Sequence, residues 1–501
     1  TITITENESA PVITLATSTA SVAENSLAIG DLPNALFAII ATSSQVTNED
    51  ITVTLSTSGS ATDGTDYTVA SGSSNNGNGS LGGQTITISA GATTGTITGT
   101  PTDDSIYEDD EVATIAISDV SGGGATESGT QSVSITITEN ETAPTITLAT
   151  STASVAENSG TTITLTATAS QVADEDIIVT LSTSGIATNG TDYTSVNSTT
   201  ITILAGSTTE TKSFAPTDDS VYEGDEATSV SISSVSGGGA TESGTQSVSI
   251  TITEDESIPT ITMSASQTSA AENSGTEVTL TLTTSQIADE DIVVSLSASG
   301  TISSSDYVST SLSPSTITIS AGSTTGTVSA TPSDDSIYEG DESLTVSISS
   351  VSGADAVESG VQSITFTITE NESAPVITLA TSTSSVAENS GTTVTLTATA
   401  SQVADEDIIV TLASTGTATN GTDYSSLGGE TITISAGATT GTITGTPTDD
   451  SIYEDDETAT IAISFVSGGG ATESGTQSVS ITITENESAP IVTLTASATS
   501  I

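Results

Sequence analysis

Acidic side chains recur in one pattern along this chain of 501 residues. The densest group is DDSIYEDDE at residues 103–111, and close copies follow at 218–226, 334–342 and 449–457. Two carboxylates about 5 Å apart repel each other by roughly 3 kcal/mol at an effective dielectric constant near 20. A loop that holds five or six of them is unfavourable without a cation, so the pattern predicts a metal site.

The ligand atoms available at such a site are oxygens, because the chain has no histidine and no cysteine. An all-oxygen ligand set selects a hard cation. Many carboxylates at flexible spacing favour calcium over magnesium, which demands near-ideal octahedral geometry. We therefore predict calcium as the cofactor. A solvated acidic turn, as on a salt-adapted surface, is the alternative interpretation.

Two further acids recur once per repeat, in the strings S-[VA]-A-E-N and [GS]-[TS]-D-Y. They are Glu24 and Asp66 in the first repeat, and turn or capping chemistry is the alternative to a metal-binding role. The acids at 48–50, 174–176, 289–291 and 405–407 are interpreted as solvated loop charge. All eight tyrosines occupy two motif positions, after the turn aspartate or inside the acidic loop, and are interpreted as packing residues.

Together with the D-D-x-x-x-E-x-D-E loop, these two strings resemble the Calx-beta domain of sodium/calcium exchangers, integrin β4 and large bacterial surface proteins. The resemblance covers nearly the whole chain, once per repeat. Three of the four repeats end in Glu-Asn-Glu where the family often has a run of aspartates. The third repeat also departs, with Ala270 in place of valine and Ser304-Ser305 in place of Gly-Thr.

The resemblance implies a set of calcium ligands in each repeat, with a backbone carbonyl supplied by the residue before the loop tyrosine. In the first repeat they are Glu24, Asp66, Asp103, Asp104, Ile106 (carbonyl), Glu108, Glu111, Glu139 and Glu141. In the second they are Glu157, Asp192, Asp218, Asp219, Val221 (carbonyl), Glu223, Glu226, Glu254 and Glu256. In the third they are Glu272, Asp306, Asp334, Asp335, Ile337 (carbonyl), Glu339, Glu342, Glu370 and Glu372. In the fourth they are Glu388, Asp423, Asp449, Asp450, Ile452 (carbonyl), Glu454, Glu457, Glu485 and Glu487.

The elements that position these acids follow from the repeat period. The string T-E-[ND]-E has its first glutamate at positions 6, 139, 254, 370 and 485, which are 133, 115, 116 and 115 residues apart. We predict four repeats at 9–141, 142–256, 257–372 and 373–487, the first with insertions around 27–41 and 71–83. Residues 1–8 are interpreted as the last strand of a preceding repeat and 488–501 as the first strand of a following one, so we expect a longer chain.

Within each repeat, isoleucine and valine alternate with threonine and serine, as in SVSITIT at 247–253. This period of two predicts strands, and about seven such runs per repeat fit an immunoglobulin-like antiparallel sandwich. The predicted fold is therefore all-β, a tandem array of sandwiches. Short Ser-Ala-Pro and similar linkers predict end-to-end stacking into an extended rod of roughly 160 Å.

Charge excludes several function classes. The net charge is −62 and the only basic side chain is Lys212, so we expect no binding to nucleic acid or to anionic membrane surfaces. The longest apolar run, 35–41, is too short to span a membrane. Without histidine or cysteine there is no ordinary general base or nucleophile, and although carboxylate pairs can serve a glycosidase, we expect no enzyme activity.

We expect an extracellular or cell-surface fibre or adhesin stalk, stiffened by calcium and associating with copies of itself into filaments for surface attachment or a biofilm matrix. Cell-surface or matrix components are further expected partners. A calcium-sensing or ligand-binding module of a larger surface protein is the alternative. The apolar segment 32–40, with Phe37, is a candidate contact for a neighbouring subunit, and packing on its own repeat is the alternative.

Overall fold

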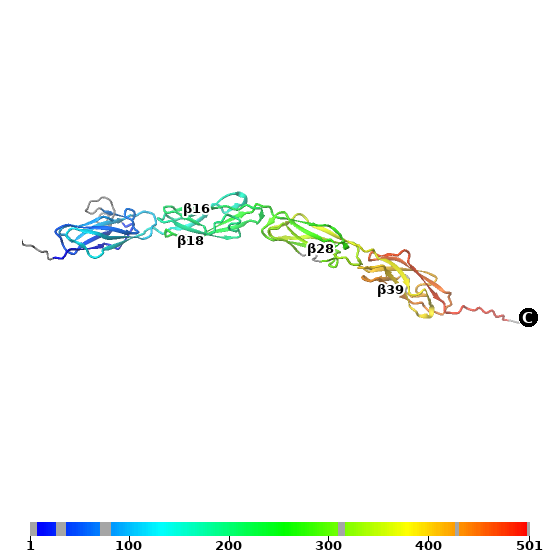
Figure 1. The fold of residues 1–501 in the computed structure, drawn as a ribbon. Coiled ribbons are helices and arrows are strands. Elements are labelled where there is room, and N and C mark those ends of the chain that lie inside the picture. The colour runs from blue at the N-terminus through cyan, green and yellow to red at the C-terminus, as the bar shows by residue number, and fades with distance from the viewer. Residues whose placement is uncertain (1–7, 27–36, 71–81, 309–315, 426–429, 498–501) are drawn as a thin grey trace, which may run out of the picture. The chain divides into compact units, whose positions relative to one another are not determined.

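The computed structural model describes residues 8–26, 37–70, 82–308, 316–425 and 430–497. In these residues the regular elements are β-strands and three single-turn 3-10 helices (Figure 1). The predicted all-β class is therefore confirmed. Among the described residues, no helix is long and apolar enough to cross a membrane. The chain divides into a first unit, residues 1–219 and 224–255, and a second unit, residues 220–223 and 256–501.

The first unit opens with two five-stranded sheets, ordered β5-β7-β3-β1-β9 and β2-β10-β8-β4-β6. Their strands are β1 (Val12–Thr17), β2 (Ser21–Ala23), β3 (Phe37–Ser43), β4 (Ile51–Gly59), β5 (Tyr67–Ala70), β6 (Thr85–Ile88), β7 (Thr94–Pro101), β8 (Glu111–Ser121), β9 (Thr126–Glu127) and β10 (Ser132–Thr138). The two- to four-residue strands among them explain why more strands form than the alternating runs predict.

The second repeat has sheets β16-β13-β11-β19 and β12-β20-β18-β14-β15, and Figure 1 labels one strand of each, β16 and β18. Its strands are β11 (Thr145–Thr150), β12 (Ser154–Ala156), β13 (Ile163–Ala169), β14 (Ile177–Gly185), β15 (Thr200–Ile203), β16 (Thr209–Phe214), β18 (Glu226–Ser236), β19 (Thr241–Glu242) and β20 (Ser247–Thr253), with the 3-10 turn η1 (Glu157–Ser159).

The second unit holds the third and fourth repeats. The third has sheets β26-β28-β23-β21-β31 and β22-β32-β30-β25-β27, and the fourth has β39-β35-β33-β41 and β34-β42-β40-β37-β38. Two small parallel pairs, β17 with β24 and β29 with β36, also belong to this unit.

The strands of the second unit that precede the fourth repeat are β17 (Val221–Tyr222), β21 (Thr260–Ala265), β22 (Ser269–Ala271), β23 (Val278–Thr284), β24 (Ile287–Ala288), β25 (Ile292–Gly300), β26 (Tyr307–Val308), β27 (Thr316–Ile319), β28 (Thr325–Pro332), β29 (Ile337–Tyr338), β30 (Glu342–Ser352), β31 (Val357–Glu358) and β32 (Ser363–Thr369), with η2 (Glu272–Ser274). The fourth repeat has β33 (Val376–Thr381), β34 (Ser385–Ala387), β35 (Val394–Ala400), β36 (Val403–Ala404), β37 (Ile408–Gly416), β38 (Thr431–Ile434), β39 (Thr440–Gly445), β40 (Glu457–Ser467), β41 (Thr472–Glu473) and β42 (Ser478–Thr484), with η3 (Glu388–Ser390).

Each repeat buries its own cluster of isoleucine, valine, leucine and alanine between its two sheets. In β15 (TITI) both isoleucines are buried, whereas Thr200 faces solvent. Because successive side chains of a strand point to opposite faces, the Ile/Thr alternation directly makes one apolar and one polar face. Aromatic rings are few, and the Tyr193 and Phe214 rings lie 5.4 Å apart in the second core.

The predicted subunit contact at Phe37 is wrong for residues 37–40. These residues begin β3, which pairs with β1 and β7 inside the first sheet. Phe37 is only 2 % exposed, and its ring lies 6.1 Å from that of Tyr67. The alternative, packing on its own repeat, holds there because the in-register pairing puts this face in the core. Residues 32–36 of the segment lie outside the described residues.

The predicted partial repeats at the two ends stay predictions. Residues 1–7 and 498–501 lie outside the described residues. Residues 488–497 form no strand, and in the other repeats the first strand is held by later strands of the same repeat, as β11 is by β13 and β19.

Candidate metal centre

Strand ends converge at one end of each sandwich and carry the acids with them. In the first repeat, β2 and β10 are parallel neighbours, so their carboxyl ends meet and place Glu24 beside Glu139. Strand β8 is antiparallel to β10 and begins there, with Glu111 opposite Ile137. The acidic loop connects β7 to β8 and therefore lies at this end, next to the turn of Asp66, whose carbonyl accepts the Thr102 N–H (2.9 Å).

One carboxylate cluster comprises Glu24, Glu139 and Glu141, which bring one oxygen each within 4.8 Å of the others. The side chain of Glu24 is only 6 % exposed. The carboxylate of Glu139 accepts the backbone N–H groups of Glu108, Asn140 (2.6 Å) and Glu141 (2.6 Å). These donors fix the orientation of the Glu139 carboxylate toward its two neighbours.

A second cluster comprises Asp66, Glu108 and Glu111, again with one oxygen each within 4.8 Å. Asp66 is 7 % exposed, and its carboxylate accepts the backbone N–H of Thr62. The two clusters are adjacent, because the backbone N–H of Glu108 in the second donates to Glu139 in the first.

The acidic loop bridges the two clusters. The backbone N–H of Asp104 donates to Glu24 (3.3 Å), while burial and then the charges of Asp66 and Asp104 raise the pKa of Glu108 to about 7. Asp103 is exposed, and its charge acts on Glu141. The N–H of Ile106 donates to the Asp104 carboxylate (2.7 Å), which closes a tight turn. The structure thus brings eight of the predicted acids of the first repeat together, and the role of the Ile106 carbonyl stays a prediction.

Burial, and after it the charges of neighbouring carboxylates, raise the pKa values of these groups. Burial raises the pKa of Glu24 to about 7, and the charges of the neighbouring glutamates add to the rise. Burial, then the hydrogen bond and charge of Asp66, raise the pKa of Glu111 to about 8. Without a cation, such clusters hold protons near neutral pH because their members cannot all be ionised at this separation.

The same arrangement recurs in the second unit. Glu272, Glu370 and Glu372 form a cluster within 4.8 Å. Burial and Asp306 raise the pKa of Glu342 to about 8, and burial with four nearby carboxylates raises that of Glu339 to about 7. In this repeat Asp335 donates its N–H to Glu272 (3.2 Å) and accepts that of Ile337 (2.7 Å), and the charge of Asp334 acts on Glu372.

The fourth repeat repeats these contacts with its own residues. Asp450 donates its N–H to Glu388 (3.2 Å) and accepts that of Ile452 (2.6 Å). Backbone N–H groups of Glu487 and Glu454 lower the pKa of Glu485 to about 2, so this carboxylate is ionised. Burial and Asp423 raise the pKa of Glu457 to about 7, and the charge of Asp449 acts on Glu487.

In the second repeat, Glu157, Glu254, Asp255 and Glu256 form a four-acid cluster within 4.8 Å. Asp192 is buried and accepts the N–H of Thr188, as Asp66 does from Thr62. Of the other predicted ligands of this repeat, Asp218 and Asp219 are exposed and Glu226 begins β18. Val221 begins β17, and Glu223 belongs to the second unit.

Orphaned oxygens support a cation at these clusters. The Oε2 atoms of Glu141, Glu372 and Glu487 are inaccessible to solvent and accept no hydrogen bond. A buried carboxylate oxygen without a donor is costly, and the same position recurs in three repeats. Oxygen ligands, high charge and irregular spacing fit calcium.

Two acids that the sequence prediction set aside lie beside the clusters of the preceding repeat. The charge of Asp174 acts on Glu108 and Glu111, and that of Asp405 acts on Glu339 and Glu342. Burial and its neighbour Glu175 raise the pKa of Asp174. These aspartates were interpreted as solvated loop charge because nothing local to segments 174–176 and 405–407 links them to a loop some 65 residues earlier. The only signal in the sequence was that these acids recur at the same position of each repeat, directly before strands such as β14 and β37.

Comparison with known proteins agrees with the repeat pattern. A family model described as the Calx-beta domain matches residues 6–141, 139–257, 254–372 and 370–487. No curated protein matches the chain by sequence.

Several solved structures match parts of the chain at low similarity. The calcium binding domain CBD12 of CALX1.1 is 15% identical, with 43% of this chain and 77% of that chain covered and a TM-score of 0.19. The Yersinia pseudotuberculosis adhesin InvE is 14% identical, with 44% and 58% covered and a TM-score of 0.23. Invasin, a bacterial integrin-binding protein, is 13% identical, with 95% and 79% covered and a TM-score of 0.21.

Proposed function

We propose, from the premise that this chain belongs to the Calx-beta family, that it is a section of an extracellular stalk or fibre whose repeats are stiffened by calcium. The observation that carries the proposal is the position of Asp174 and Asp405, each beside the acid clusters of the preceding repeat. A cation at those clusters would neutralise acids of both repeats at once. Calcium would therefore stabilise the junction as well as the loop.

The residues that would hold calcium in the first repeat are the two clusters and the loop between them. Glu24, Glu139 and Glu141 would bind on one side and Asp66, Glu108 and Glu111 on the other. Calcium supplies positive charge, and the chain supplies a preset orientation, because backbone N–H groups already hold several of the carboxylates. The equivalent acids of the other repeats would act in the same way.

Calcium concentration connects this site to a location. Ions that bind only the ordered state stabilise it by mass action, and extracellular modules bind calcium with dissociation constants of about 10⁻⁴ to 10⁻³ M. Such repeats are stiff at millimolar calcium and slack where calcium is scarce. We therefore infer a role outside the cell, in attachment to a surface or in a matrix, and a mechanical role for the repeats with no catalytic step.

Small-angle X-ray scattering of the chain tests this function. We expect the maximum dimension to increase and its distribution to narrow when calcium replaces a chelator. Sodium chloride at equal ionic strength and magnesium at equal concentration are the controls, because general screening acts through either salt. A maximum dimension that changes equally with calcium, magnesium and sodium chloride, or with none of them, would contradict a calcium-stiffened stalk.

A further inference from the structure

The tyrosine of the acidic loop contacts the repeat that follows it in the chain. In the first unit, the Tyr107 N–H donates to the Val172 carbonyl (2.9 Å) and the Asp174 N–H donates to the Tyr107 carbonyl (3.2 Å). The second unit repeats this pairing, between β17 and β24 for Tyr222 and between β29 and β36 for Tyr338. A short parallel strand pair therefore holds the backbone of each of these tyrosines.

A turn of the receiving repeat lies against the tyrosine ring. A Cβ atom built on Gly239 would lie 2.5 Å from the Tyr107 ring, and one built on Gly470 would lie 2.5 Å from the Tyr338 ring. Both turns read Gly-Gly-Gly-Ala, and these glycines occupy the third position. Neither ring therefore leaves room for a side chain at that position of its turn.

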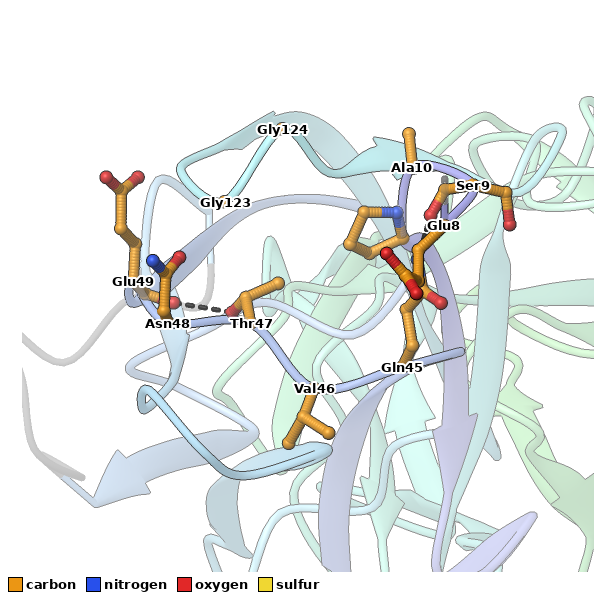
Figure 2. A pocket seen from close by; sticks show the side chains of 11 residues that line it. Glu8, Ser9, Ala10, Gln45, Val46, Thr47, Asn48, Glu49, Gly123 and Gly124 are labelled. Carbon is orange, nitrogen blue, oxygen red and sulfur yellow. Dashed lines mark hydrogen bonds between the residues drawn. The ribbon is translucent and has the colours of Figure 1, made fainter. Parts of the chain in front are cut away.

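Each repeat builds this receiving surface from the same two parts. In Figure 2, Gly123 and Gly124 of the first repeat line one groove with residues 45–49, the segment that corresponds to the partner strand of the tyrosine. The turn reads Gly-Gly-Gly-Ala in the first, second and fourth repeats. The third repeat departs, with Gly-Ala-Asp-Ala at 353–356. Its receiving surface therefore carries a carboxylate where the others have a glycine.

This departure strains the backbone. Ala354 and Asp355 each have a φ of 50°, in the left-handed region that disfavours side chains, and the same positions hold glycine in the other repeats. Side chains held in such a conformation are concentrated at functional contacts. The contact that Asp355 makes is therefore of interest.

Asp355 binds the tyrosine of the second repeat's loop, whose tip, residues 220–223, belongs to the second unit. The Tyr222 hydroxyl donates to the Asp355 carboxylate (3.2 Å). Tyr222 is only 6 % exposed and belongs to the apolar core cluster of the third repeat, whereas Tyr107 and Tyr338 are half-buried. The third repeat thus holds its tyrosine by the hydroxyl as well as by the backbone.

The loops differ as well, two residues after the tyrosine. The first and fourth loops have aspartate there, and the second and third have glycine. The Tyr107 hydroxyl donates to Asp109 (3.0 Å). The Tyr453 hydroxyl donates to Asp455 (3.1 Å). A tyrosine hydroxyl has one hydrogen to donate, so a loop whose hydroxyl binds its own aspartate has none left for Asp355.

We propose that Asp355 determines which tyrosine loops the third repeat receives: loops with glycine two residues after the tyrosine dock, and loops with aspartate there are rejected. An aspartate loop would bring its own carboxylate and that of Asp355 to one hydroxyl oxygen with a single hydrogen between them, and like charges placed together exclude a partner. The all-glycine turns receive both kinds, since Gly239 faces an aspartate loop and Gly470 a glycine loop.

Such selectivity has a use in an array of similar repeats. Wrong docking between domains is a characteristic failure of repeat proteins, and a repulsive group on one surface makes the wrong contact costly. Asp355 thereby excludes the first and fourth loops from the surface that belongs to the second. This inference goes beyond calcium stiffening and does not rest on it, because the contacts involve neither the metal nor its predicted ligands' carboxylates.

Hydrogen exchange in the full chain tests the selectivity. Chelator and a low salt concentration of about 20 mM keep calcium and screening from masking the charges. The reporter is the Asp289 amide, which donates to the Tyr222 carbonyl (3.2 Å). Gly224→Asp gives the second loop the aspartate of the first, and exchange at this amide should become at least about tenfold faster. Adding Asp355→Gly removes the opposing charge and should restore most of the protection.

Gly340→Asp is the matched control, because it makes the same change in the third loop. The φ of Gly340 is 79° and that of Gly224 is 78°, so the backbone strain of the two changes is alike. The third loop faces Gly470, so exchange at the Asp405 amide, which donates to the Tyr338 carbonyl, should change much less. Equal loss of protection in the two single variants, unchanged exchange in Gly224→Asp, or no recovery in the double variant would overturn the proposal.

Transplanting the aspartate gives an independent result. Gly239→Asp places it opposite the first loop, which carries Asp109, and Gly470→Asp places it opposite the third, which carries glycine. Each change brings a Cβ atom 2.5 Å from a tyrosine ring, so the difference between the two variants reports the loop. The Asp174 amide should lose more protection in Gly239→Asp than the Asp405 amide loses in Gly470→Asp. Equal losses, or the opposite order, would show that the charge does not select the loop.

Discussion

Replacing one glutamate of the second cluster in every repeat should stabilise the chain in chelator and destabilise it in calcium. The variant carries Glu111→Gln, Glu226→Gln, Glu342→Gln and Glu457→Gln. Glutamine keeps a donor for the neighbouring aspartate without needing the proton that Glu111 must bind near neutral pH. The variant should therefore be more stable than the unchanged chain in chelator and less stable in calcium.

The magnitude follows from the geometry. The oxygens of Asp66, Glu108 and Glu111 lie within 4.8 Å of one another, and two charges at that distance repel by about 3.5 kcal/mol at an effective dielectric constant of 20. Solvent access and proton uptake reduce this, so we expect a gain of about 1–2 kcal/mol per repeat in chelator. In calcium, a tenfold loss of affinity from one missing ligand costs about 1.4 kcal/mol per repeat.

Thermal unfolding followed by circular dichroism and calorimetry, each with calcium and with chelator, measures the change in stability in both buffers. The control variant, Asp119→Asn, Glu210→Gln, Glu277→Gln and Glu430→Gln, removes four exposed charges outside the clusters. Its unfolding temperature should shift in the same direction in both buffers. If the cluster variant behaves like this control, the clusters are solvated surface charge and the ligand assignment is wrong.

Three further outcomes follow from the same contacts. The cluster glutamates have pKa values raised to about 7–8 in the folded state, so this state binds protons more tightly than the unfolded state. In chelator, the free energy of unfolding should therefore fall as the pH rises from about 5 to 8. A free energy of unfolding that does not change over this range would contradict the raised pKa values. A Cβ atom on Gly470 would lie 2.5 Å from the Tyr338 ring, so Gly470→Ala should speed hydrogen exchange at the Asp405 amide, which donates to the Tyr338 carbonyl. Gly475→Ala, whose Cβ would meet nothing within 4 Å, should not, and equal exchange in both variants would show that the Tyr338 ring does not depend on Gly470. Calcium should slow cleavage by a glutamate-specific protease after the last strand of each repeat, and unchanged rates would argue against ligands there.

The fold and the clusters were predictable because both depend on local pattern. Alternation predicted the buried and exposed faces of strands such as β15. The spacing of the acids predicted a cation at the acidic loop, and the Calx-beta resemblance implied that Glu24 and Asp66 join that loop in one site. The Calx-beta resemblance is confirmed by the family match, and it added the closing glutamates, Glu139 and Glu141, that spacing alone leaves open.

Contacts between repeats were not predictable in the same way. Tyr107 and Asp174 lie 67 residues apart, and nothing local to either indicates that β-type hydrogen bonds join them. Phe37 was misplaced because its apolar segment lies within the predicted insertion around 27–41, and the start of β3 could not be distinguished from a surface loop without its pairing to β7. Strands of two or three residues such as β2 carry too little alternation to be seen, although β2 positions Glu24.

Isothermal titration of calcium into the chelator-stripped chain tests the central claim most directly. Saturable binding at micromolar to millimolar calcium, with at least one ion per repeat and a loss of affinity in the four-glutamine variant, is the predicted result. An absence of saturable heat up to about 10 mM calcium, or equal affinity in the variant, would contradict calcium binding by these clusters.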